Sequence, residues 1–167
     1  FTCTRCRASR PLSHQTWKQP ADEPIWRYEL DEVVYQAVIE NARVPVLALH
    51  ALRVGSRLGF TFSPELNVYE RGASEPFIEL DIWAIVEGRI CVGEAKTVDR
   101  LAEQGERDVI ARLVRVAEAV TADELVVATT QDALRPATRA LLESALTGRR
   151  PRLRILERAP LEDVGTV

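Results

Sequence analysis

Three residues have types and spacing that could do chemistry: Asp81, Glu94 and Lys96. Asp81 ends the tripeptide ELD, and after twelve intervening residues Glu94 and Lys96 form the two ends of the tripeptide EAK. Two carboxylates and an ammonium on half-buried strands would stabilise a fold poorly, because each must lose its water shell. Carboxylate oxygens are ligands for hard divalent cations. The pattern therefore predicts a site for Mg²⁺ or Mn²⁺.

A β-hairpin must position these side chains. Residues 78–86 (IELDIWAIV) and 89–96 (RICVGEAK) are rich in β-branched and apolar residues, and Glu87-Gly88 between them supplies a turn. The face of the hairpin away from the candidate site is expected to be apolar throughout. It would be formed by Ile78, Leu80, Ile82, Ala84, Val86, Cys91, Gly93 and Ala95.

The length of the turn decides whether the polar side chains meet. With a loop of two or four residues, Asp81 pairs with Glu94. Glu79 then pairs with Lys96, and strand alternation places all four side chains on one face. A three-residue loop with Gly88 in the left-handed conformation is the alternative, because Glu is unfavourable at the first position of a type I′ turn. That alternative would separate Asp81 from Glu94.

Lys96 is unusual in this chain, which has only two lysines, Lys18 and Lys96, among 22 basic residues. An ammonium is compact and has a shiftable pKa, whereas a guanidinium is a wide fork that is permanently charged. A lysine can therefore touch one water and one phosphate oxygen at a metal site. Chance placement of a single lysine is the alternative interpretation.

The tripeptides ELD and EAK on consecutive strands resemble the motif of the PD-(D/E)xK superfamily, the restriction-endonuclease-like nucleases of restriction, repair and recombination. Asp81 matches the Asp that ends the second core strand in that family, and residues 94–96 match its (D/E)xK tripeptide. Leu80 stands where the motif has Pro, so the sequence departs from the pattern there. The resemblance covers about residues 28–158 and implies a nuclease.

The same resemblance implies a role for each residue of the site. Asp81 and Glu94 would hold Mg²⁺ or Mn²⁺, and the Ala95 backbone carbonyl would be a further ligand. Lys96 would orient the attacking water or pair with the pentavalent phosphorus centre. Glu79, which is expected to face Lys96, would support that lysine from outside the metal shell.

A helix is predicted at residues 28–41 (YELDEVVYQAVIEN), where apolar residues recur at helical spacing and acids stand in the first turn. In the superfamily a leading helix often contributes one more acid. Glu32 is our choice, to complete the metal shell or bind a second ion, with Asp31 and Glu40 as alternatives. Such acids also complement the helix dipole or stay solvated, which is the simpler interpretation.

Helices and strands alternate after the hairpin. We predict a helix at 108–120, a strand at 124–130, a helix at 136–146 that begins with proline, and a strand at 153–157. The full order is helix, three strands, helix, strand, helix and strand. It predicts an α/β fold with a restriction-endonuclease-like core, in which helices flank a mixed β-sheet made of an antiparallel meander and a parallel strand.

Length and composition predict one globular domain with a small appendage, since the chain has 167 residues and 46% hydrophobic content. No run of about twenty apolar residues exists, which excludes a membrane-spanning helix. No signal peptide precedes the fold, so a cytoplasmic location is expected. The chain contains no Met, which suggests a domain from a larger parent protein whose other domains are partners.

The net charge of −3 argues against a general polyanion-coating protein. Arginines nevertheless gather at 148–154 (GRRPRLR), and Arg107, Arg112 and Arg115 lie just before or on the helix predicted after the hairpin. Both groups are candidates for phosphate contacts. A solvated edge and an ordinary helix surface are the alternatives, and they carry more weight.

Residues 1–27 are expected to form a partial zinc-ribbon-like appendage and linker ahead of a nuclease-like domain at 28–167. Cys3 and Cys6 form a C-x-x-C knuckle, which supplies two thiolates to a structural Zn²⁺ that needs two more ligands. The other pair is expected from a segment upstream of this sequence, and His14 as a third ligand is a second version. A disulfide and a pair of free thiols are the alternatives.

Together these observations predict a metal-dependent nuclease that hydrolyses phosphodiester bonds in nucleic acid, with DNA favoured over RNA, in defence, restriction or repair. The alternative is a catalytically inactive nuclease-fold module that binds nucleic acid or a protein partner within a larger protein. The complete acidic pair with its lysine favours the enzyme. The sequence shows neither a nucleophile elbow nor a phosphate-binding glycine loop that would favour another chemistry.

Overall fold

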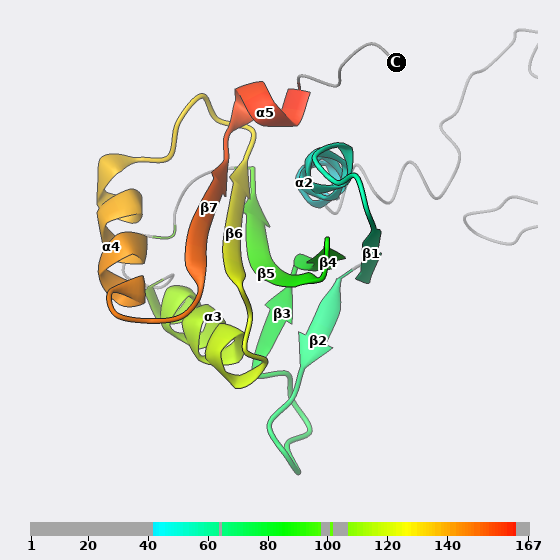
Figure 1. Ribbon diagram of the computed structural model, residues 1–167. Helices are drawn as coiled ribbons and strands as arrows, with labels where there is room; N and C mark the ends of the chain where they lie inside the picture. Colours follow the sequence, from blue (N-terminus) through cyan, green and yellow to red (C-terminus); the bar gives the residue numbers. More distant parts are fainter. Residues whose placement is uncertain (1–41, 64, 98–100, 102–106, 163–167) are drawn as a thin grey trace, which may run out of the picture. The chain divides into compact units, whose positions relative to one another are not determined.

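The computed structural model describes residues 42–63, 65–97, 101 and 107–162, almost all within the compact unit Arg43–Val167. Several predictions lie outside these residues. They concern the appendage at 1–27, the helix at 28–41, and the candidate ligands Cys3, Cys6, His14, Asp31, Glu32 and Glu40. The described residues form helices packed on a β-sheet (Figure 1).

A mixed five-stranded sheet lies at the centre of the described fold (Figure 1), with the order β1-β4-β5-β6-β7. Its strands are β1 (Phe60–Ser63), β4 (Ile82–Val86), β5 (Arg89–Lys96), β6 (Glu124–Thr129) and β7 (Arg152–Leu156). β4 pairs antiparallel with β1 and β5, whereas β5, β6 and β7 are parallel neighbours. The predicted α/β class and mixed sheet are confirmed.

Helices cover both faces of this sheet. α2 (Arg43–Val54) and α5 (Arg158–Glu162) lie against one face, and α3 (Arg107–Ala119) and α4 (Pro136–Leu146) lie against the other (Figure 1). α3 connects β5 to β6 and α4 connects β6 to β7, as parallel neighbours require. The ranges predicted for α3, β6, α4 and β7 agree with the structure to within one residue at each end.

Two apolar clusters hold the layers together, one on the α3 face of the sheet and one on the α2 face. Alternation along β6 sends Leu125 and Val127 to the α3 face and Val126 to the α2 face. The buried residues of α3 recur at helical spacing, and Val109 beside them is only partly buried. These buried residues are Ile110, Leu113, Val114, Val116 and Ala117.

The turn between β4 and β5 has two residues. Glu87 and Gly88 have φ angles of 52° and 78°, the left-handed values that a type I′ turn needs at both central positions. Glu87 is held in this conformation by two hydrogen bonds, from its N–H to Gly59 O (2.9 Å) and from Arg57 N–H to its Oε1 (2.9 Å). The even-loop register is confirmed, and the three-residue alternative is wrong.

Residues 78–86 do not form the single strand that was predicted. β3 (Ile78–Leu80) pairs antiparallel with β2 (Leu66–Val68) in a separate two-stranded sheet, and the chain changes sheets at Asp81. The side chains of β3 therefore pack on the α3 face, while those of β4 pack on the α2 face. The prediction of one continuous apolar face is wrong for Ile78 and Leu80, which are separated from Ile82, Ala84 and Val86.

The sequence patterns do not predict α2, β2 or α5, and give no range for β1. α2 buries Val44, Ala48 and Leu52 at helical spacing, but it lacks the acidic first turn that marks a helix start. β1 and β2 have four and three residues, too few for alternation to show. No helix in the described ranges is long and apolar enough to cross a membrane.

Candidate metal centre

Asp81 lies at the break between β3 and β4, at the end of the β4–β5 ladder. The last pair of that ladder is Ile82↔Gly93, so the predicted direct pairing of Asp81 with Glu94 is wrong. Its side chain turns toward β5, where the Ala95 N–H donates a hydrogen bond of 2.8 Å to Asp81 Oδ2. This bond fixes one carboxylate oxygen where the two strands separate.

Glu94 is a buried carboxylate in β5, with 5% of its surface exposed. It alternates with Ala95, whose side chain packs on the α2 face, and shares the side of Val92, which packs on the α3 face. Lys96 Nζ lies 2.6 Å from Glu94 Oε1. The second oxygen, Oε2, is buried and has no hydrogen-bond partner within the described residues.

The expected grouping of Asp81, Glu94 and Lys96 is therefore present. Glu94 lies on the side of the sheet away from Ile82, as the even register requires. Leu80 lies on the same side as Glu94, because β3 changes faces at the break. We expected Glu94 to lie on the face opposite both Leu80 and Ile82. It lies opposite Ile82 but on the side of Leu80, so the expectation holds for only one of the two residues.

Burial dominates the electrostatics of both carboxyl groups. It raises the pKa of Glu94 to about 7, with the negative charge of Asp81 adding to the rise and Lys96 opposing it. Burial also raises the pKa of Asp81, against the hydrogen bond from the Ala95 N–H and the charge of Lys96. Near pH 7 Glu94 is therefore only partly ionised, and either a proton or a cation can compensate the two acids.

The Ala95 carbonyl points toward the same space as its N–H. In a β-strand the N–H and C=O of one residue face the same neighbour, and the Ala95 N–H faces Asp81. Ladder pairing with β4 ends two residues earlier, at Gly93. The backbone oxygen of Ala95 therefore points to the side of β5 on which Asp81 lies.

Two more acids lie at the margin of this group. Glu79 was expected to pair with Lys96, but that prediction is wrong, because the β4–β5 ladder ends at Ile82↔Gly93 and Glu79 lies in the smaller sheet, paired with Asn67. A hydrogen bond with Glu79 raises the pKa of Glu65, and the charge of Glu79 contributes to the raised pKa of Glu94. Sequence reasoning missed Glu65, since only the β2–β3 pairing brings it near the site.

The described residues limit which ion this centre could hold. No group of three or more Asp, Glu, His or Cys side chains among them is arranged to bind a metal ion. Asp81 and Glu94 therefore stand as a pair of carboxylates. Mg²⁺ fits such a pair, because it keeps several waters and usually binds through one or two carboxylates.

Comparison with protein-family models, curated proteins and solved structures found no match to this chain. No family is assigned on that basis. What can be inferred about function rests on the geometry of the site and on the order of the elements around it.

The arginines of α3 have structural partners. Arg112 donates to Phe77 O (2.9 Å), which ties α3 to the start of β3. Arg115 pairs with Glu70 (2.8 Å) and stacks over the Phe77 ring, with 4.8 Å between its Cζ and the ring centroid. These contacts favour the simpler interpretation of both residues as helix-surface anchors.

Cys91 plays no part in the centre. Its side chain is buried on the α2 face, away from Glu94. Burial raises the pKa of its thiol to about 11, and the negative charge of Glu124 adds to the rise. A thiol in this state is a poor metal ligand, because the thiolate is the binding form.

Proposed function

We propose that this chain is a metal-dependent nuclease with a PD-(D/E)xK-type site formed by Asp81, Glu94 and Lys96. The observation that carries the proposal is the state of Glu94. It is a carboxylate almost fully removed from water, paired on one oxygen with Lys96 and unpaired on the other. A buried unpaired carboxylate oxygen costs free energy, which a bound cation would offset.

The oxygens present fit Mg²⁺ or Mn²⁺. Asp81 and Glu94 would hold the ion through carboxylate oxygens, and the Ala95 carbonyl would add a neutral ligand. Hard cations prefer oxygen ligands of this kind. A metal bound here would lower the pKa of a coordinated water and offset the charge that develops on phosphate.

Asp81 and Lys96 would have different roles beside the metal. Asp81 stays oriented because the Ala95 N–H fixes one of its oxygens. Lys96, whose side chain is 36% exposed, can extend from Glu94 to solvent and reach a phosphate oxygen or a water. Its ammonium would stabilise negative charge at the reacting phosphate.

The order of elements supports the same proposal. The antiparallel strands β1, β4 and β5 are followed by the α3 crossover to the parallel strand β6, an order expected of a restriction-endonuclease-like core. α2, which precedes β1, contains no acidic residue. An acid from a leading helix would therefore have to come from elsewhere, and Glu32 remains a prediction.

A cleavage assay tests the proposal. Purified full chain is incubated with Mg²⁺ or Mn²⁺ and with single-stranded, duplex and branched DNA, and with RNA. We expect cleavage, favouring DNA, that EDTA abolishes. Glu94→Gln should lower the rate at least about 100-fold, since it removes a ligand charge. Glu143→Gln, which makes the same change on the exposed surface of α4, should leave the rate unchanged.

The opposite outcome would favour a different function. If every substrate stays intact with both metals, the protein is better described as a nuclease-fold module that binds nucleic acid or another domain without cutting. Equal rates for Glu94→Gln and the wild type would contradict the assignment of the site, even if cleavage is seen.

A further inference from the structure

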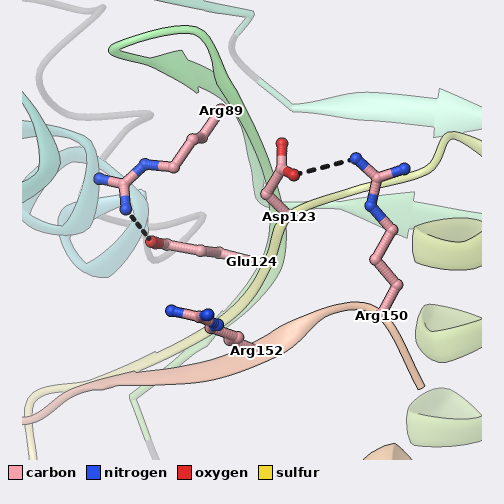
Figure 2. A pocket seen from close by; sticks show the side chains of 5 residues that line it. All are labelled: Arg89, Asp123, Glu124, Arg150 and Arg152. Atoms are coloured by element: carbon pink, nitrogen blue, oxygen red, sulfur yellow. Dashed lines mark hydrogen bonds and ion pairs between the residues drawn. The ribbon is translucent and has the colours of Figure 1, made fainter.

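A pocket of about 360 Å³ lies at the end of the sheet opposite the carboxylate pair, and its residues are Arg89, Asp123, Glu124, Arg150 and Arg152 (Figure 2). Arg89, Glu124 and Arg152 are the first residues of β5, β6 and β7. Because these strands are parallel, their first residues lie at the same end of the sheet. The fold, and not sequence proximity, brings these five residues together.

Backbone hydrogen bonds fix the geometry of this end of the sheet. Asp123 N–H donates to Ile90 O (2.8 Å), and Arg152 N–H donates to Asp123 O (2.9 Å), which links the starts of all three strands. Ile90 N–H donates to Asp123 Oδ2 (2.9 Å). A charged site built on such a frame has little freedom to rearrange when a ligand binds.

Every carboxylate oxygen in the pocket already has a donor. Asp123 Oδ1 accepts from Arg150 (3.2 Å), and its Oδ2 accepts from the backbone of Ile90. Glu124 Oε1 pairs with Arg89 (3.2 Å) and Oε2 with Arg154 (3.2 Å). Glu124 Oε2 also accepts from Cys91 Sγ (3.8 Å), so each of the four oxygens faces at least one donor other than Arg152.

Arg152 differs from the other two arginines that line the pocket, because it pairs with neither carboxylate. Within the described residues its guanidinium makes no ion pair or hydrogen bond, and Figure 2 draws the pairs Arg89–Glu124 and Asp123–Arg150 but none to Arg152. The lining carries three guanidinium groups against two carboxylates. The pocket thus has an excess positive charge and a free planar donor fork.

We propose that this pocket binds a phosphate group, with Arg152 as its principal ligand and Arg89 and Arg150 at its sides. A guanidinium fork donates two parallel hydrogen bonds to phosphate oxygens, which makes arginine well suited to recognise this anion. The volume is at the lower end of the roughly 300–1,000 Å³ that small-molecule sites occupy. A phosphate-bearing ligand of nucleotide size would fill it.

This phosphate site is separate from the candidate metal centre. Arg89 and Lys96 stand at the two ends of β5, about 23 Å apart for seven steps of an extended strand. Glu124 and Arg152 pair in register with Cys91, whose side chain lies on the α2 face, whereas Glu94 lies on the α3 face. A phosphate held here is therefore not the one that would react at Glu94.

Two probes test the proposal on the full chain: inorganic phosphate, followed by titration calorimetry, and a defined DNA duplex, followed by fluorescence anisotropy in EDTA at several salt concentrations. Arg152→Gln should weaken binding of at least one probe about tenfold or more, and Arg152→Lys should recover only part of the loss. Arg139→Gln removes the same charge from a pair with Glu157 beyond the other end of β7, and should bind both probes like the wild type.

Each outcome decides the matter. Loss of phosphate binding alone identifies a small phosphate-bearing ligand, and loss of duplex binding with a shallower salt dependence identifies a backbone phosphate. If Arg152→Gln binds both probes as the wild type does, or if neither probe binds the wild type saturably, the proposal is overturned. None of these results depends on metal-dependent cleavage, so failure of the nuclease proposal would be seen separately.

Discussion

Glu94 is the residue at which opposing demands meet. Strand β5 buries it against the α3 face beside Asp81 and Lys96, and burial raises its pKa to about 7. A buried carboxyl of this kind weakens a fold unless a cation or a proton compensates it. Glu94 is therefore expected to carry a proton or to bind a cation, depending on pH and on the metal.

Removal of the Lys96 ammonium should abolish function without unfolding the protein. We expect Lys96→Ala to lower metal-dependent cleavage at least about 100-fold, because it removes the only lysine of the site and its charge at the reacting phosphate. Lys96→Arg keeps the charge but widens the donor, and should restore little activity. Circular dichroism and cleavage rates measure the two effects.

Two results for the Lys96 variants would contradict a role for Lys96 in cleavage. Full activity of Lys96→Ala would show that the lysine only neutralises Glu94. A loss of activity accompanied by a loss of secondary structure would instead assign Lys96 to the stability of the fold.

The stability of the metal-free protein should depend on pH through Glu94. Its pKa is raised from 4.5 to about 7 in the folded state, so the folded form binds more protons than the unfolded form between these values. The contribution of Glu94 is therefore present below about pH 4.5 and is lost as the pH rises toward 7. Asp81 contributes in the same direction.

Urea unfolding in EDTA from pH 4.5 to 7.5 measures this effect. The wild type should lose stability relative to Glu94→Gln as the pH rises, because the amide cannot ionise. Glu143→Gln, on the exposed surface of α4, should follow the wild type. Parallel curves for the wild type and Glu94→Gln would show that Glu94 titrates normally.

The elements that carry the site are the β4–β5 hairpin and its break at Asp81. Alternation of side chains and a two-residue turn are local properties, so the sequence predicted the grouping of Asp81, Glu94 and Lys96. The break is not local. It depends on the pairing of β3 with β2, which no glycine or proline near Asp81 signals, and the hydrogen bond to Ala95 and the approach of Glu65 could not be predicted without it.

Gly93 controls the approach of β5 to β6. A Cβ added there would overlap the Val126 carbonyl, with the Val126 carbonyl carbon at 2.8 Å, and backbone atoms between two paired strands cannot move aside. We expect Gly93→Ala to destabilise the protein by about 3 kcal/mol or more, or to prevent folding. Thermal and urea unfolding measure the loss.

Gly59→Ala provides the matched comparison. A Cβ at Gly59 would meet no atom within 4 Å, so its effect should stay within about 1 kcal/mol. Equal stabilities for the two variants would mean that β5 and β6 are not as close as the ladder requires.

At the scale of the whole described fold, charge is separated between the ends of one sheet. Asp81 and Glu94 outnumber Lys96 at one end of β5, and three arginines outnumber Asp123 and Glu124 at the starts of β5, β6 and β7. The order of helices and strands from Arg89 to Leu156 was predictable, because each of these elements is long enough to show its period. The convergence of Arg89, Arg150 and Arg152 was not, since it arises only when the parallel strands align.

The central claim is that Asp81 and Glu94 hold one divalent cation. Crystals of the full chain soaked in Mn²⁺ test it directly through anomalous difference density. We predict a peak about 2.0–2.5 Å from carboxylate oxygens of both residues, absent in Glu94→Gln, and the same map would show whether Glu32 is a further ligand. Saturating Mn²⁺ with no peak between Asp81 and Glu94 would contradict the account.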